Sequence, residues 1–411
     1  MSHDELPIRA GRTDDWDGVG PLLTEVFHDT PDPDVPDLDR EVFEPERSLI
    51  VEDDGRVVGH AGAFTRELTV PGAVVPAAHV TMVGVAPTHR RRRLLTRLMH
   101  RQLRDVRDTG REPIAVLWAS EGRIYPRFGY GLASQLLKLA IDTREVRLTG
   151  QAAAARDKLR AGAPAALQVE LAKVYDQLRP DRPGWSSRDD RWWRYVLADP
   201  PSRRHGGTER RAVVHEGQTG VDGYALWRTK SAWDDAGPKG EVIVQTVVAG
   251  SQEAYRALWG FLFGVDLTRT ASYWAAAVDE PLQYLVNEPR RLNARLSDSL
   301  WVRVVDVPAA LSARRYAVGV DAVLEVTDPL LPENQGRWRV VGDAGGATCT
   351  HTDAEPDLAC DVVDLGAIYL GGTSLAALAG AGRVRELRPG RLGAVSAAFG
   401  WHRAPAAHEV F

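Results

Sequence analysis

Hydrophobic and polar positions in the first third of the chain follow two different periods. Apolar residues three and four positions apart predict helices over 14–27 and 94–106. Alternating or short continuous apolar runs predict strands at 6–10, 48–52, 56–65, 68–77, 80–85, 114–118 and 136–142. Asp54-Gly55 and Pro71-Gly72 are strong turn signals between consecutive strands. We expect one unit of mixed strands and helices, which the strand at 136–142 closes.

The rest of the chain repeats this order with a different composition. Residues 143–166 are rich in Ala, Arg and Gly, which favours a boundary between units. A helix is expected at 167–178, strands at 211–215, 223–228 and 241–248, and a helix at 251–264. A third series of apolar segments starts near residue 300. We therefore predict three domains, at 1–148, 149–297 and 298–411.

Composition excludes several classes of protein. The 411 residues are 44% hydrophobic and 26% charged, with a net charge of −5, so nothing global indicates a nucleic-acid partner. Cys349 and Cys360 are the only cysteines, too few for a disulfide framework or a four-cysteine zinc site. The start of the chain lacks an apolar signal-peptide core, and no apolar run reaches the ~18 residues of a membrane span. We expect a cytoplasmic protein without a metal.

The segment VTMVGVAPTHRRRRLL, residues 80–95, carries the strongest chemical signal. An apolar strand runs into a turn, and then into a helix that begins after four consecutive arginines. A helix N-terminus presents unpaired N–H groups and a partial positive charge, and guanidinium groups add charge-assisted donors. The pattern predicts a site for a pyrophosphate, although an arginine run by itself is more often a solvated face or a nucleic-acid patch.

A second segment, ASEGRIYPRFGYG at 119–131, follows the next predicted strand. Strand, arginine-rich helix start, strand and tyrosine-bearing turn is the order found in GNAT N-acetyltransferases. The two segments, the chain length, the three-unit layout and the terminal Phe411 together resemble the Eis (enhanced intracellular survival) family. The resemblance implies an α+β fold with two GNAT-like mixed-sheet units followed by a sterol-carrier-protein-like α+β unit.

The resemblance also implies an activity. Acetyl-CoA would be the co-substrate, and the acetyl group would pass directly to a primary amine of a cationic acceptor, such as an aminoglycoside or a lysine side chain, in a homohexamer. Tyr125 would be the general acid and the carboxylate of Phe411 the general base. Backbone N–H groups of 83–85 are candidates for polarising the thioester carbonyl. The residues expected to bind the cofactor are Val83, Gly84, Val85, Arg90, Arg91, Arg92, Arg93, Leu94, Leu95, Thr96, Ser120 and Glu121.

Arg93 departs from the family pattern, which has glycine at this position. We expect a helical, negative φ there, which any residue can adopt. If Arg93 instead disables the site, the alternative is a non-catalytic CoA- or lipid-binding protein with a vestigial acetyltransferase unit, or a regulator that senses CoA. Asp29, within the acidic segment 28–47, and Glu409 are further candidates for holding a cationic substrate.

Overall fold

The computed structural model describes residues 6–30, 38–150 and 158–411, so Asp32, Asp34 and Asp37 of the acidic segment lie outside the described residues. The chain forms two compact units. The first unit contains Met1–Ser134, Ser299–His402 and Val410–Phe411, and the second contains Gln135–Asp298 and Arg403–Glu409. Each unit combines mixed β-sheets with helices, which confirms the predicted α+β class.

A seven-stranded sheet organises the first unit, in the order β1-β2-β3-β4-β5-β16-β6. Its strands are β1 (Ile8–Ala10), β2 (Leu49–Asp53), β3 (Arg56–Val70), β4 (Ala73–Val85), β5 (Ile114–Trp118), β6 (Gly131–Leu132) and β16 (Leu300–Val304). The turns at 54–55 and 71–72 are confirmed, because Asp54, Gly55 and Gly72 all have positive φ. The strands that flank Pro71-Gly72 are longer than predicted and form one long antiparallel hairpin.

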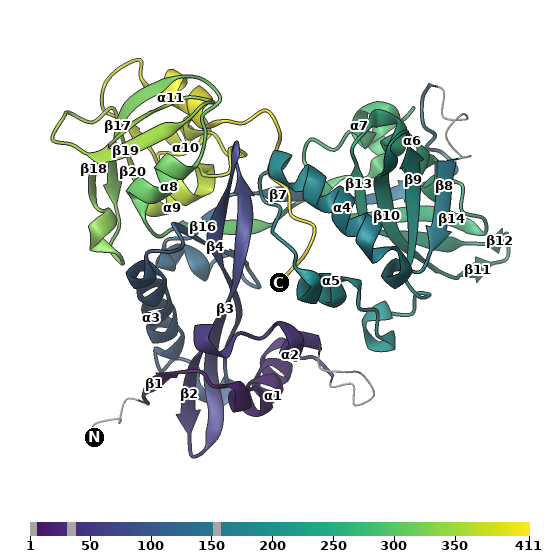
Figure 1. The fold of residues 1–411 in the computed structure, drawn as a ribbon, viewed down its shortest axis with the longest axis horizontal. Coiled ribbons are helices and arrows are strands. Elements are labelled where there is room, and N and C mark those ends of the chain that lie inside the picture. The colour runs from purple at the N-terminus through teal and green to yellow at the C-terminus, as the bar shows by residue number, and fades with distance from the viewer. Residues whose placement is uncertain (1–5, 31–37, 151–157) are drawn as a thin grey trace. The chain divides into compact units, whose positions relative to one another are not determined.

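The first unit also contains the helices α1 (Trp16–Phe27), α2 (Leu38–Val42) and α3 (Leu94–Thr109). The apolar stripe of α3 is buried through Leu94, Leu98, Met99 and Leu103, and α1 buries Trp16 against the same strands. In Figure 1, α1 and α3 lie to either side of the long β3–β4 ribbon. Burial of these stripes fixes where α3 begins, directly after the arginine run.

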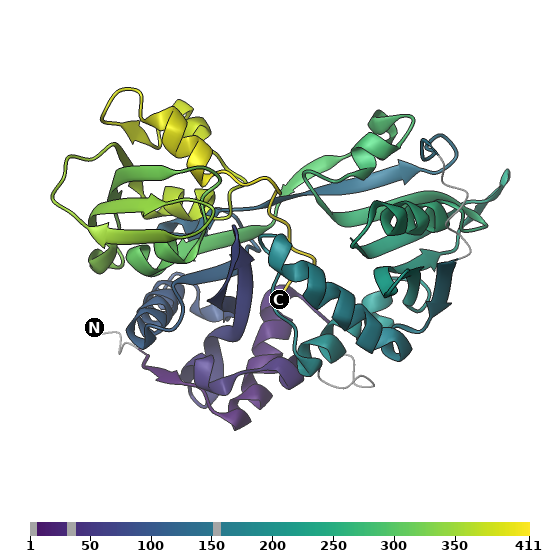
Figure 2. The ribbon, with the colours of Figure 1, turned by 45° about the horizontal axis from the view of Figure 1, so that its top comes forward.

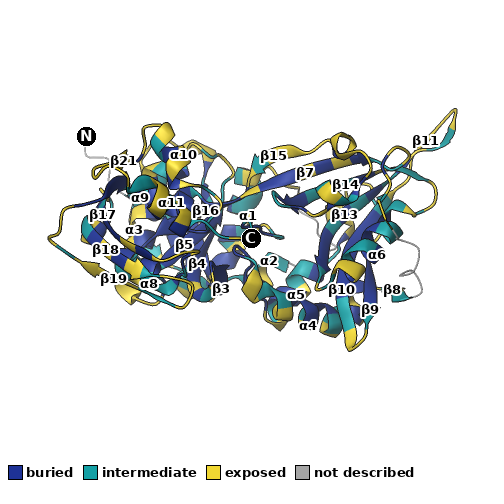
Figure 3. Cartoon of the chain, turned by 90° about the horizontal axis from the view of Figure 1, so that it is seen from above, coloured by how far each residue is buried: buried dark blue, intermediate teal, exposed yellow. Residues whose placement is uncertain are grey.

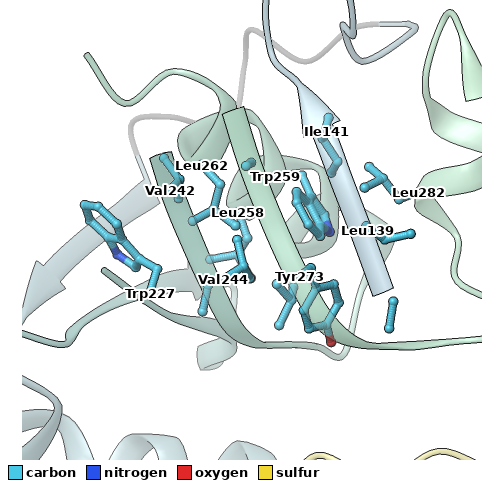
Figure 4. Close-up of a cluster of buried hydrophobic side chains, with 14 of the residues drawn as sticks. Leu139, Ile141, Trp227, Val242, Val244, Leu258, Trp259, Leu262, Tyr273 and Leu282 are labelled. Atoms are coloured by element: carbon cyan, nitrogen blue, oxygen red, sulfur yellow. The ribbon is translucent and has the colours of Figure 1, made fainter. Parts of the chain in front are cut away.

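A second seven-stranded sheet, in the order β15-β7-β14-β13-β10-β9-β8, forms the core of the second unit. Its strands are β7 (Gln135–Asp142), β8 (Leu159–Gly162), β9 (Arg211–Gly217), β10 (Gly220–Lys230), β13 (Gly240–Ala249), β14 (Thr268–Ala277) and β15 (Arg295–Asp298), with a small ribbon of β11 (Trp233–Asp234) and β12 (Gly237–Pro238). Its helices are α4 (Gln168–Leu178), α5 (Asp190–Leu197), α6 (Gln252–Phe263) and α7 (Leu282–Leu285). Figure 4 shows Trp259 of α6 among the side chains of this core, beside Tyr273 of β14.

A five-stranded sheet with four helices forms the last part of the first unit (Figure 2). Its strands are β17 (Val320–Thr327), β18 (Gly336–Gly342), β19 (Ala347–His351), β20 (Leu358–Asp361) and β21 (Arg385–Glu386), and its helices are α8 (Val307–Ala313), α9 (Val362–Ile368), α10 (Leu375–Gly380) and α11 (Leu392–Phe399). Two glycines let α9 approach the first sheet. A methyl group on Gly131 would overlap the Val363 carbonyl oxygen, and one on Gly366 would overlap the Val302 carbonyl oxygen.

The chain passes twice from one seven-stranded sheet to the other, which we call the strand exchange. β7 follows β6 of the first sheet along the chain, but it lies between β14 and β15 in the second sheet. β16 follows β15 of the second sheet along the chain, but it lies between β5 and β6 in the first sheet. The expectation that the strand at 136–142 closes the first unit is therefore wrong, although the strand itself is present. The chain changes sheet at Ser134, whose hydroxyl accepts a hydrogen bond of 3.0 Å from the Leu300 N–H. The division at 148/149 and 297/298 remains a prediction from the sequence.

Burial follows the sheets in both units. The strands are mostly buried, and exposed positions gather on loops and on the outer sides of helices (Figure 3). Several helices begin with a residue whose side chain accepts a hydrogen bond from the first turn, among them those capped by Asp189, Ser251, Asp306, Asp361 and Ser374. No helix in the described part of the chain is both long and apolar enough to cross a membrane.

Candidate active site

The carboxyl-terminal half of β4 has an open edge. β5 runs parallel to β4 and pairs with it only from Ala77 to His79. Beyond His79, no other described strand takes the place of β5, so residues 83–85 lie in the part of β4 that is no longer paired with β5. An extended chain that binds in this gap can form the hydrogen bonds that a further strand would form.

A β-bulge interrupts the other side of β4. The register with β3 shifts between His60, which lies opposite Gly84, and Gly62, which lies opposite Thr81. Met82 and Val83 fall in the shift, and Met82 adopts a φ of 53°. A bulge of this kind turns backbone groups out of the ladder, so Val83 has no register partner on β3 and none on β5.

The turn from β4 into α3 carries the arginines. A 3-10 helix, η3 (Pro87–His89), follows the strand, and the four arginines at 90–93 are all exposed. The first residue of α3, Leu94, is buried. Arg93 is the N-cap residue, and its side chain accepts no hydrogen bond from the helix. The N–H groups of the first turn therefore face this cationic turn without a side-chain cap, which suits a polyanion.

The backbone at Arg93 corrects one expectation. Its φ is +61° and its ψ is 10°, so it is left-handed rather than helical, and Arg91 is also left-handed at +63°. Left-handed conformations cost a non-glycine residue roughly 1–2 kcal/mol. The family's usual glycine suits this position because of its backbone conformation, and arginine occupies it here against that preference.

The turn after β5 places Tyr125. This residue starts the 3-10 helix η4 (Tyr125–Phe128), is 6% exposed, and belongs to one buried cluster with Val80 and Leu117. Val83 packs against the same cluster. Burial raises the pKa of Tyr125, and a side-chain hydrogen bond with Ser120 partly offsets that rise. The phenol therefore remains protonated at neutral pH and can donate.

Strand β16 supports this turn. A methyl group on Gly122, between Glu121 and Tyr125, would lie 3.2 Å from the Trp301 ring, so the indole packs closely on the turn. Arg303 is fully buried, forms two hydrogen bonds of 2.7 and 2.8 Å with Asp328, and packs against Gly129. Residues 300–304 were not predicted to belong to this site, because no local signal in the sequence shows that a distant strand completes the first sheet.

The end of the chain returns to the first unit. The Phe411 ring packs on His79 of β4, with ring centroids 4.7 Å apart. His79 is buried, and its Nδ1 lies 2.9 Å from the Ala77 carbonyl oxygen. This contact places Phe411 at the residue where β4 and β5 cease to pair.

Other sequence candidates lie elsewhere. Glu409 belongs to the second unit, where its carboxylate binds the buried Arg188 at 2.8 Å. Asp29 is exposed after α1. Both cysteines are buried free thiols, and the described residues contain no cluster of His, Cys, Asp and Glu that could hold a metal ion. The predicted cofactor residues at 83–85, 90–96 and 120–121 all belong to the first unit.

Three segments of the chain match known domain families. Residues 7–133 and 184–304 each match an acetyltransferase (GNAT) domain family, and 307–407 match a sterol carrier protein domain family. An uncharacterized N-acetyltransferase of Streptomyces avermitilis is 46% identical over 400 residues, covering 97% of this chain and 98% of its own length. N-acetyltransferase Eis of Mycobacterium tuberculosis is 35% identical over 399 residues, covering 94% of each chain.

Solved structures show the same architecture over the whole chain. The crystal structure of Eis1 from Mycobacterium abscessus aligns with a TM-score of 0.85 and 34% identity, over 98% of this chain and all of that one. A GCN5-related N-acetyltransferase from Anabaena variabilis, at 20% identity and a TM-score of 0.84, shares the fold. By whole-length similarity and by its two GNAT domains followed by a sterol carrier domain, this chain belongs to the Eis family of GNAT N-acetyltransferases.

Proposed function

We propose that the first unit transfers the acetyl group of acetyl-CoA directly to a primary amine of a cationic acceptor, such as an aminoglycoside or a lysine side chain. One observation carries the proposal. An open, bulged end of β4 leads into a helix start that has no side-chain cap and follows four exposed arginines. That combination offers a strand edge for the pantetheine arm and a cationic helix end for the pyrophosphate.

In this arrangement the cofactor residues divide by task. Backbone groups of Val83, Gly84 and Val85 pair with the arm and polarise the thioester carbonyl. Arg90 to Arg93, with the first-turn N–H groups of Leu94, Leu95 and Thr96, bind the phosphates. Ser120 and Glu121, at the opposite side of the gap, border the arm where β5 ends.

The chemistry needs a base and an acid. The Phe411 carboxylate takes a proton from the amine, directly or through a water, and the free amine attacks the acetyl carbonyl. The tetrahedral intermediate collapses as the thiolate leaves, and the Tyr125 hydroxyl supplies the proton that makes it a thiol. Neither cysteine suits a covalent intermediate, because both thiols are buried and burial raises the pKa of each to about 12.

The test measures thiol release from acetyl-CoA with a panel of amines: an aminoglycoside, a polyamine and a lysine-containing peptide. Tyr125→Phe is expected to lower kcat about 100-fold, as for a lost general acid. Tyr130→Phe is the matched control, because Tyr130 is a buried phenol in edge contact with Tyr125 whose hydroxyl has no partner among the described residues. Equal rates for the two variants would exclude Tyr125 as the acid.

The base has a separate test. One alanine added after Phe411 moves the carboxylate by a residue and leaves every side chain unchanged. We expect kcat to fall at least tenfold, while the affinity for acetyl-CoA stays within twofold. An alanine added before Met1 is the control. Full activity of the C-terminally extended protein would exclude the Phe411 carboxylate as base.

Two further properties belong to the proposal. The chain assembles into a homohexamer, which rests on family membership alone, and the acceptor is not a nucleic acid, which rests on the net charge of −5. Light scattering of the purified protein tests the first, and a monomeric mass under assay conditions would exclude it.

A further inference from the structure

A hydrogen bond from the neighbouring strand β3 reaches the bulge in β4. His60 of β3 is fully buried, and its Nδ1 lies 2.6 Å from the Met82 carbonyl oxygen. A carbonyl oxygen only accepts, so Nδ1 must carry the proton and donate. The bond therefore holds the left-handed residue that starts the bulge.

The remaining contacts of His60 fix its ring. Its Cε1 lies 3.1 Å from where a methyl group on Gly62 would stand, and the Phe43 ring lies 6.1 Å away between centroids. Nε2 is buried and has no hydrogen-bond partner within the described ranges. Burial lowers the pKa of His60 to about 4, so the ring is neutral at neutral pH. A purely apolar role does not explain why a polar ring stands here with one nitrogen unsatisfied.

The location gives this bond a consequence for the cofactor. Val83 follows Met82 directly, and its direction depends on the conformation of Met82. A left-handed residue between two extended ones costs roughly 1–2 kcal/mol, and without compensation the strand can relax toward regular pairing with β3. Regular pairing turns the Val83 backbone groups back toward β3 and away from the open edge.

We propose that His60 is a positioning residue for acetyl-CoA: its Nδ1–H holds the Met82 carbonyl and thereby keeps the Val83 backbone turned to the open edge of β4. The inference rests on the proposed function, in which the pantetheine arm binds at that edge. His60 itself does not touch the reacting atoms.

Three substitutions distinguish the effect of losing the Nδ1–H donor from the effect of losing the imidazole ring. His60→Asn keeps an N–H at the δ position but removes the ring. His60→Gln places its N–H one bond farther out, and His60→Leu keeps apolar bulk without a donor. Because an unpaired buried carbonyl is costly, we expect the KM for acetyl-CoA to rise about tenfold in the Leu and Gln variants and to stay within threefold in Asn.

Two other readouts distinguish positioning from general stability. The thermal midpoint Tm should fall most in His60→Asn, because the smaller side chain leaves a cavity. The three variants should therefore rank differently by Tm than by the KM for acetyl-CoA. The KM for the amine should not change. Amide hydrogen exchange of peptides covering 80–86 should be faster in Leu and Gln than in Asn, with or without cofactor. If the Leu variant does not fold, the Asn and Gln pair carries the comparison.

The outcomes separate the two proposals. If the wild-type protein neither binds nor consumes acetyl-CoA, the proposed function fails, and the hydrogen-exchange order still reports whether His60 holds the bulge. If the wild-type protein is active and KM follows Tm through the three variants, or exchange at 80–86 is unchanged, the role of His60 proposed here is wrong.

Discussion

Two strand-to-helix turns in this protein have the same topology and opposite chemistry. In the first unit, β4 leads through α3 to the parallel strand β5; in the second, β13 leads through α6 to the parallel strand β14. The first turn spans residues 86–93 and has no side-chain cap. The second has only Gly250 and Ser251, and the Ser251 hydroxyl accepts a hydrogen bond from the Ala254 N–H.

Positively charged residues lie at the start of α3, whereas carboxylates lie at the start of α6. Four exposed arginines precede α3. At α6, the Ser251 hydroxyl donates to Asp222 at 2.8 Å, and Glu253 lies in the first turn. Carboxylates stabilise a helix N-terminus from within the protein, and they repel an external anion. The two units share the strand-helix-strand order and differ at the helix end, and for this reason we propose a pyrophosphate site in the first unit and none in the second.

The segments after the second parallel strand differ as well. After β5, the buried Tyr125 keeps a protonated hydroxyl beside Ser120. After β14, the buried Glu280 accepts a hydrogen bond from Tyr255 of α6, and Tyr255 accepts one from the Leu282 N–H. The Tyr255 hydroxyl therefore forms these two hydrogen bonds within the second unit.

Charge reversal at the first turn should have the largest effect. In the proposed site, Arg91→Glu with Arg92→Glu removes two charge-assisted contacts to phosphate worth about 2 kcal/mol each, so we expect the Kd for acetyl-CoA to rise about a thousandfold. Calorimetry measures it. Arg111→Glu is the control, an exposed arginine just past the other end of α3. Equal losses in both variants would show that only net charge matters.

The next effect is a pH dependence of the second unit. Burial raises the pKa of Glu280 to about 7, so the folded state holds a proton that the unfolded state has lost. Stability from this group is complete below the unfolded pKa near 4.5 and is lost as pH rises through 7, at most about 3 kcal/mol. Urea unfolding between pH 5 and 8 measures the slope, and Glu280→Gln should abolish it.

A second buried group in that unit has the opposite slope. Burial lowers the pKa of His408 to about 3, so its contribution is lost as pH falls below about 6.5. Glu280→Gln removes the contribution of Glu280 to the pH dependence and leaves that of His408. An unchanged slope in Glu280→Gln above pH 6.5 would contradict the assignment to Glu280.

Ser251→Ala should have a smaller effect, confined to the second unit. Loss of the N-cap lowers the free energy of unfolding by about 1 kcal/mol. Because α6 is not the proposed cofactor helix, KM for acetyl-CoA and kcat should stay within twofold. A clear rise in the KM for acetyl-CoA would place the cofactor, or a contact that it needs, at the second turn.

The smallest effect is expected at Arg93. Arg93→Gly relieves the left-handed backbone and removes one cation, so stability should rise by up to about 1 kcal/mol while KM for acetyl-CoA changes less than about fivefold. Thermal unfolding and steady-state kinetics measure the two quantities. Arg92→Gly is the control, because Arg92 is also exposed and does not have a positive φ.

The features that could be predicted from the sequence depend on residues close to one another along the chain. The turns at 54–55 and 71–72, helix α3 and the arginine run before it are local patterns, and the structure contains them. The strand exchange was missed, because the apolar pattern of 136–142 fits either sheet and the pairing is decided by residues more than a hundred positions away. The left-handed Arg93 and the bond from His60 to Met82 were missed for another reason: the apolar pattern predicts helices and strands, but not single backbone angles or single side-chain contacts.

The crossing at Ser134 and Leu300 also has a consequence for how the chain is made. When the ribosome has synthesised the first 134 residues, the place between β5 and β6 still lacks its strand, which is about 165 residues away along the chain. At ~5–20 residues per second, that strand follows only after roughly ten to thirty seconds. During this delay the nascent polypeptide presents an unfilled, aggregation-prone β-edge, so cellular chaperones have a defined segment of this protein to shield.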